Sequence, residues 1–88
     1  MNGDAVHIAP DRVVRAEADL VATVLEVRVA AGQQVSAGEE LALLESMKME
    51  IPVLAERAGT VAEVAVAVGD PVDVGALLVL VHVEREPQ

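Results

Sequence analysis

The chain has 88 residues, a formal net charge of −9, and no cysteine, phenylalanine, tyrosine or tryptophan. This length fits one small domain with a single core, which neither disulfides nor thiolate–metal sites can support. The acidic charge disfavours binding to nucleic-acid phosphates and to anionic membrane surfaces, and the lack of aromatic residues disfavours base stacking. We therefore expect no nucleic-acid or membrane partner, and a domain that is monomeric when isolated.

The first residues, 1–12, carry acidic side chains, a glycine and a proline, without the apolar run of a secretory signal. We expect a flexible N-terminal tail over 1–12, a folded domain over 13–84, a C-terminal tail over 85–88, and a cytoplasmic location. The two histidines, His7 and His82, lie far apart in no metal-ligand spacing, so no metal site is predicted. A binding or enzymatic role for them is a weaker alternative than solvated or structural histidines.

An alternating segment over 23–29 is the first predicted element. It is rich in valine, which favours strands because its branched Cβ fits a pleated surface. Period-two alternation predicts one face with Leu25, Val27 and Val29, and another with Val24, Glu26 and Arg28.

The same layout recurs 37 residues later, with 11 identities over the 22 positions of 23–44 and no gap. Each copy continues with a glycine turn, a short strand, a second glycine turn and an apolar strand. In the first copy these lie at Gly32, Val35, Gly38 and 41–44; in the second, at Gly69, Val72, Gly75 and 77–83. Tandem copies of short strands predict an all-β flattened barrel or sandwich with quasi-two-fold symmetry. An alternative for 39–49 is a helix, because this segment is rich in helix-forming residues. The matching segment 76–83, however, has a strand pattern.

Between the copies lies the hexapeptide Glu45-Ser46-Met47-Lys48-Met49-Glu50. Strands over 41–46 and 50–54 flank it, and Pro52 requires an edge position for the second of them. This predicts a hairpin with Met47 and Lys48 at its tip. Lys48 is the only lysine, and Met47 and Met49 are the only methionines besides Met1. A lysine in a turn is usually just solvated and methionine usually fills cores, but exposed methionines beside a charged turn residue indicate recognition by another protein.

The hexapeptide resembles the attachment signature of biotinyl carrier domains, Met-Lys-Met preceded by Glu-Ala or Glu-Ser. The likeness extends from Val13 to Glu84. It implies a flattened β-barrel of two four-stranded antiparallel sheets, with the modified lysine on an exposed hairpin. It also implies that Lys48 carries covalent biotin, and that a biotin protein ligase recognises Met47, Met49, Glu45 and Glu50, the roles of the two glutamates being less defined.

The resemblance further implies a non-catalytic carrier. It would shuttle carboxyl groups between the biotin carboxylase and the carboxyltransferase of a biotin-dependent carboxylase, with an acyl-CoA carboxylase as the expected type. The sequence itself contains no Ser/His/Asp set, phosphate loop or carboxylate pair in an apolar pocket.

Two alternatives remain open at this point. Lipoyl carrier domains share the fold and the lysine position but usually have Asp-Lys-Ala, and a purely structural module would keep the fold without modification. The first copy also departs from the family pattern, because 16–22 contains neither glycine nor proline where the second copy has Gly59.

Overall fold

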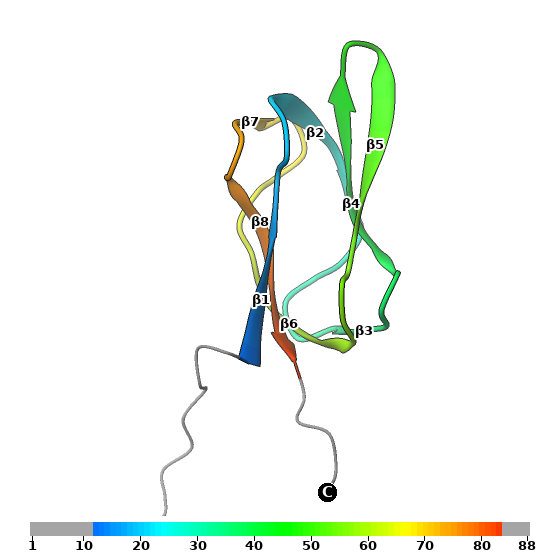
Figure 1. Cartoon of the computed structure of the whole chain (residues 1–88), viewed down its shortest axis with the longest axis vertical. Helices are drawn as coiled ribbons and strands as arrows, with labels where there is room; N and C mark the ends of the chain where they lie inside the picture. The colour runs from blue at the N-terminus through cyan, green and yellow to red at the C-terminus, as the bar shows by residue number, and fades with distance from the viewer. Residues whose placement is uncertain (1–11, 84–88) are drawn as a thin grey trace, which may run out of the picture.

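The structure, a computed structural model, describes residues 12–83. Eight strands make up this part of the chain: β1 Val13–Glu17, β2 Ala22–Val27, β3 Gln34–Val35, β4 Glu40–Ser46, β5 Met49–Leu54, β6 Gly59–Val64, β7 Pro71–Val72 and β8 Leu77–Val83 (Figure 1). No helix long and apolar enough to cross a membrane is found in the range described.

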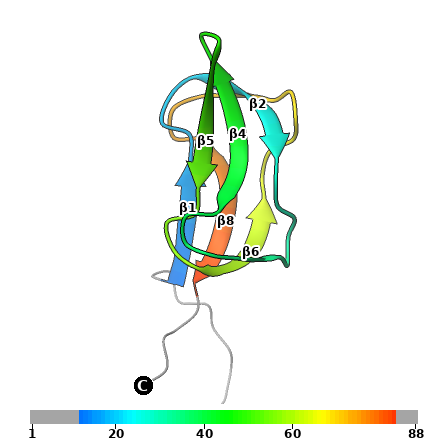
Figure 2. The ribbon, with the colours of Figure 1, turned by 90° about the vertical axis from the view of Figure 1, so that its right-hand side faces the viewer.

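The strands form two four-stranded antiparallel sheets, in the orders β1-β8-β6-β3 and β5-β4-β2-β7. Each strand of one sheet corresponds, through the 37-residue repeat, to a strand of the other sheet. The corresponding pairs are β1 and β5, β8 and β4, β6 and β2, and β3 and β7. Each sheet therefore takes two strands from each copy, so neither copy completes a sheet alone. Figures 1 and 2 show the resulting flattened sandwich, and the predicted fold class is confirmed.

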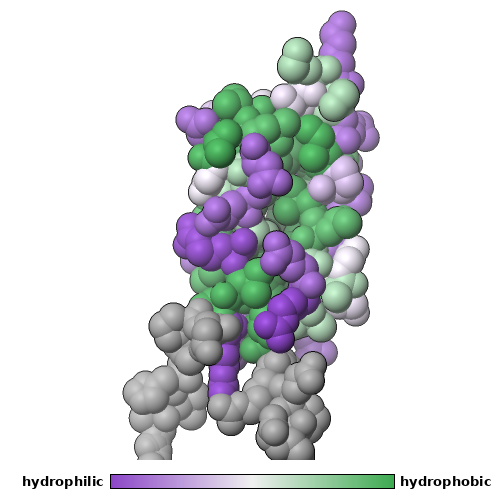
Figure 3. All heavy atoms as spheres, in the orientation of Figure 1, coloured by the Kyte–Doolittle hydropathy of each residue, from purple (hydrophilic) through white to green (hydrophobic). Residues whose placement is uncertain are grey.

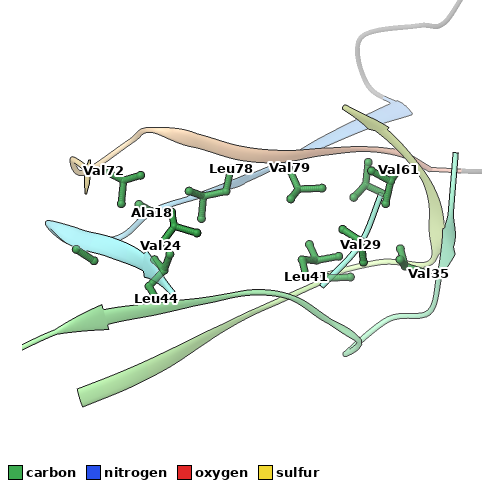
Figure 4. Packing of buried hydrophobic residues seen from close by; sticks show 13 residues of the cluster. Ala18, Val24, Val29, Val35, Leu41, Leu44, Val61, Val72, Leu78 and Val79 are labelled. Carbon is green, nitrogen blue, oxygen red and sulfur yellow. The ribbon is translucent and has the colours of Figure 1, made fainter. Parts of the chain in front are cut away.

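The core between the sheets consists of short apolar side chains (Figure 4). The largest fully buried ones are Leu41, Leu44, Leu78, Val24, Val61 and Val79. Two pairs in this set, Val24 with Val61 and Leu41 with Leu78, are related by the repeat. Leucine and valine thus fill the interior from both copies, which is why the domain folds without an aromatic residue.

The strict alternation predicted for 23–29 is wrong at its start. Val24 is only 1% exposed and lies in the core, whereas Glu26 and Arg28 are exposed. The register between β2 and β4 steps from Val24 opposite Leu44 to Glu26 opposite Leu43, so Leu25 is an extra residue on β2. Such a bulge reverses the faces that follow it, and this lets the strand direct Val24 to the core and Glu26 to solvent.

The bulge belongs to the repeat and is not an accident of one strand. In β6 the register steps in the same way, from Val61 opposite Val81 to Glu63 opposite Leu80. Val61 is 1% exposed and Glu63 is exposed, as at the matching positions of the first copy. Period-two counting misses this because the bulge is defined by the partner strand.

The predicted glycine turns are confirmed. Gly32, Gly38, Gly69 and Gly75 all have positive φ, between 87° and 94°. The Gly32 N–H donates to the Val61 carbonyl at 2.7 Å, and the Gly69 N–H donates to the Val24 carbonyl at 2.8 Å. Each turn is therefore closed onto the other copy, with equivalent bonds at the two ends of the sandwich.

Candidate functional site

The β4–β5 hairpin projects beyond the rest of the described chain (Figures 1 and 2). Its strands pair from Glu40 opposite Leu54 to Ser46 opposite Met49, which leaves a two-residue turn. Met47 and Lys48 form that turn, so the predicted hairpin tip is confirmed. Strand β5 is at the edge of its sheet, where a proline costs no ladder hydrogen bond.

The turn has a backbone conformation that suits neither of its residues. Met47 has φ 53° and Lys48 has φ 65°, the only positive values outside glycine in residues 12–83. Two positive φ angles in a two-residue hairpin indicate a type I′ turn, which favours Asn-Gly. For other residues the left-handed region costs about 1–2 kcal/mol each. Strain of this kind suggests that these two side chains serve a function and not the stability of the hairpin.

The side chains at the tip are open to solvent. Met47 is 91% exposed and Met49 is 61% exposed. Lys48 is also exposed, and the ion pairs found within residues 12–83 involve arginines instead. An amine so placed is accessible to another protein from several directions.

The charges around the tip are mostly negative. Glu45 and Glu50 are exposed and lie directly opposite each other across the hairpin. Like charges in this arrangement destabilise a strand pair by a few tenths of a kcal/mol, roughly. Arg28 lies toward the other end of β4, where its N–H donates to the Leu41 carbonyl, and its side chain is bound to Glu40 at 2.7 Å and to Glu26 at 2.9 Å. The hydrogen bond to Glu40, and then the charge of Glu26, raise the pKa of Arg28. Recognition roles for the two opposed glutamates stay a prediction.

Ser46 anchors the last strand pair before the turn. Its hydroxyl donates to the carbonyl of Val21, in the β1–β2 loop, at 3.0 Å. Because side chains alternate along β4, Ser46 faces this loop while Glu45 faces away from it. From sequence alone Ser46 has no role beyond its place in the motif, since residues 21 and 46 come together only on folding.

No other part of the described chain assembles a comparable site. A hollow of about 320 Å³ runs between the edge strands β1 and β5, lined by side chains that include Val14, Leu44 and Ile51, and it excludes Lys48. Within residues 12–83 no group of three or more histidine or acidic side chains could hold a metal. His82 is half-buried in β8, whereas His7 and the predicted tails, apart from residue 12, lie outside the described residues.

Two interlocked copies that present one exposed lysine on a hairpin define a carrier domain for a lysine-linked group. The model of the biotin/lipoyl family, described as biotin-requiring enzyme, matches residues 14–81. The chain therefore belongs to the biotin/lipoyl attachment family, and biotin is the cofactor named in the description of that family.

Among curated proteins, the chain is similar to a biotinylated protein TB7.3 homolog of Mycobacterium leprae. The two are 64% identical over 42 residues, which is 48% of this chain and 59% of the relative. A biotin/lipoyl attachment protein of Bacillus subtilis is 59% identical over 34 residues, 39% of this chain and 47% of the relative. The matched segments thus span about half the length of these relatives.

Among solved structures, the chain is similar to a single-chain, multi-domain long-chain acyl-CoA carboxylase. The TM-score is 0.79 at 32% identity, over 91% of this chain and 8% of that enzyme. The lipoyl domain of a 2-oxoglutarate dehydrogenase complex from Azotobacter vinelandii gives 0.60 at 34% identity, over 67% of this chain and 75% of that domain. The fold is thus shared with a lipoyl domain and does not by itself distinguish biotin from lipoate.

Proposed function

We propose that the chain is a biotin carboxyl carrier in which Lys48 receives biotin from a biotin protein ligase. It would shuttle carboxyl groups between the biotin carboxylase and the carboxyltransferase of a biotin-dependent carboxylase, with an acyl-CoA as the expected acceptor. The observation that carries this proposal is the single lysine at the exposed hairpin tip between Met47 and Met49. The biotinylated relatives and the acyl-CoA carboxylase with a similar fold support it.

Attachment makes simple demands on this chain. The Lys48 amine loses a proton and attacks the carboxyl carbon of biotin that the ligase has activated as its adenylate. The new N–C bond forms the amide while the C–O bond to AMP breaks and AMP leaves. Within residues 12–83 no side chain is hydrogen-bonded to Lys48, so the base that accepts the proton comes from the ligase.

After attachment the chain acts as a positioning device. Bound biotin supplies the carboxyl-carrying chemistry, and the domain keeps it at high effective concentration near both enzyme sites through the tether. The sandwich and the Ser46 hydrogen bond hold the hairpin in place, so the movement between sites is left to the lysyl arm and to whatever connects the domain to its partners.

The proposal is tested on protein purified from its native cell. We expect one biotin per chain by intact mass and streptavidin blot, peptide mapping to Lys48, and capture of carboxylase subunits with the biotinylated chain. Lipoate at this position would establish the lipoyl alternative. A chain that carries neither group would establish the purely structural one.

A further inference from the structure

The described chain exposes six large apolar side chains, and five of them lie at the end that carries Lys48. Two are the hairpin methionines. The other three are Val21, Val68 and Val74, each 65% exposed, which we call the valine collar. The sixth, Leu54, is at the far end of β5 and 49% exposed.

Three separate loops bring the collar together. Val21 lies in the β1–β2 loop, and its carbonyl accepts the hydrogen bond from Ser46, the residue that precedes the hairpin turn. Val68 precedes Gly69, whose N–H donates to the carbonyl of Val24 in β2. Val74 precedes Gly75, whose N–H donates to the carbonyl of Ala18 at the start of the β1–β2 loop. Figure 3 shows apolar side chains gathered at this end of the body, below the projecting hairpin.

The opposite end of the sandwich shows that the fold does not need these valines. The repeat places Ala58, Ala31 and Ala37 at the positions equivalent to Val21, Val68 and Val74, and all three alanines are exposed. Two of the three loops are held there by equivalent bonds, from Gly32 to Val61 and from Gly38 to Ala55, whereas the bond from Ser46 to Val21 has no counterpart because residue 83 is valine. Folding therefore accepts alanine at each position, and the apolar surface at the lysine end has another use.

The charges at the two ends also differ, and the other end has acidic residues of its own, Glu39 and Glu40, where the lysine end has Ala76 and Leu77. Asp70 and Asp73 at the lysine end replace Gln33 and Ser36 at the other end. Glu45 and Glu50, which are both exposed, add two more carboxylates beside the tip. The surface thus has apolar side chains with an acidic surround, and it fits a partner surface that is apolar with lysine or arginine around it.

We propose that the valine collar is the docking surface for the biotin protein ligase, an inference that rests on the proposed function. Before modification, the Lys48 amine extends from the hairpin by no more than the length of its own side chain. The ligase must therefore bring its active site up to the hairpin and meet the end of the body around it. The partners that act later reach biotin through the completed arm, which removes this need for close contact.

The test measures biotin transfer by the cognate ligase, with ATP and biotin, to purified unmodified chain. The variant Val21→Ala/Val68→Ala/Val74→Ala gives the lysine end the residues of its counterpart. We expect KM for the chain to rise about tenfold or more with kcat unchanged, because docking contacts are lost and the reacting atoms are untouched. The matched control, Ala58→Val/Ala31→Val/Ala37→Val, keeps the wild-type KM. Added salt raises KM for the wild type, because the acidic surround is screened.

Thermal unfolding accompanies each assay, and Val→Thr changes at the three positions replace the alanines if the first variant unfolds. An unchanged KM, an equal rise in the control, or normal biotinylation with slower carboxyl transfer would each overturn the ligase assignment. A wild-type chain that accepts no biotin would overturn the proposed function itself. The two failures are therefore distinguishable.

Discussion

The two ends of the sandwich share a backbone plan and differ in what they present. At one end β4 and β5 are joined by the tight turn that carries Lys48. At the other end the equivalent strands, β8 and β1, are paired at His82 and Val13, and no turn joins them. The chain enters and leaves the domain there, so the lysine projects from the end that is free of these connections. The repeat supplies the scaffold, and departures from the repeat supply the function.

The ends also differ in how closely their strands approach. Gly59 is buried and pairs with Val83, and a Cβ on it would collide with the carbonyl of His82. Its counterpart is Ala22, but pairing between β2 and β4 begins one residue later, with Thr23 opposite Glu45. The strands are therefore less tightly joined beside the lysine hairpin, which explains why the first copy lacks this glycine.

Moving the lysine to the other end gives the largest effect. In Lys48→Arg/Arg57→Lys the only lysine lies in the exposed β5–β6 loop, opposite the hairpin. We expect complete loss of biotin by streptavidin blot and intact mass, because the proposed docking surface for the ligase lies at the opposite end. Arg57→Lys alone should keep one biotin. Biotin at position 57 of the double variant would show that the two ends are equivalent to the ligase.

A side chain added at Gly59 should have the second-largest effect. Gly59→Ala should lower the free energy of unfolding by about 3 kcal/mol, because backbone must move to relieve the collision. Ala22→Gly, the reciprocal change, should cost about 1 kcal/mol at most. Urea unfolding followed by circular dichroism measures both, since the chain has no aromatic fluorophore. Equal losses would contradict the looser pairing at the lysine end.

The glycine turns should behave alike at the two ends. Gly69→Val and Gly32→Val each place a β-branched residue at positive φ, 94° and 90°, where the added Cβ meets no atom within 4 Å. The cost is backbone strain alone, about 2 kcal/mol in each case. The same unfolding experiment compares them. A difference of more than about 1 kcal/mol would mean that the turns are not equivalent.

The hairpin turn should become more stable when its function is removed. Replacing Met47 and Lys48 by Asn-Gly supplies the residues that a type I′ turn favours, and we expect a gain of about 1 kcal/mol in unfolding free energy. The variant cannot be biotinylated. Loss of stability would show that the two side chains hold the hairpin together after all.

The smallest effect on stability is expected from the methionines. Met47→Ala and Met49→Ala should change the unfolding free energy by less than about 0.5 kcal/mol, because both side chains are exposed. Ligase kcat/KM should nevertheless fall by about tenfold. Leu54→Ala removes another exposed apolar side chain of β5, away from the tip, and serves as the control with wild-type kinetics.

Much of the site followed from the order of residues. The repeat of 37 residues, the four turn glycines and the position of Lys48 at the junction of the copies are properties of the chain read in one dimension. They predicted the sandwich, the hairpin and its tip because turns and strand periodicity are set by neighbouring residues. The methionines on either side of the lysine indicated biotin through resemblance, and no contact in the fold was needed for that.

Tertiary structure decided what depends on a partner strand or a distant loop. The bulges at Leu25 and Ala62 exist only against β4 and β8, so the true faces of β2 and β6 could not be counted from sequence. The need for glycine at 59 arises from the carbonyl of a residue 23 positions away. The valine collar gathers residues from three loops that hydrogen bonds across the sandwich bring to one end. The sequence by itself thus predicted Lys48 as the attachment point, and the packing of the two copies determined the surface around it.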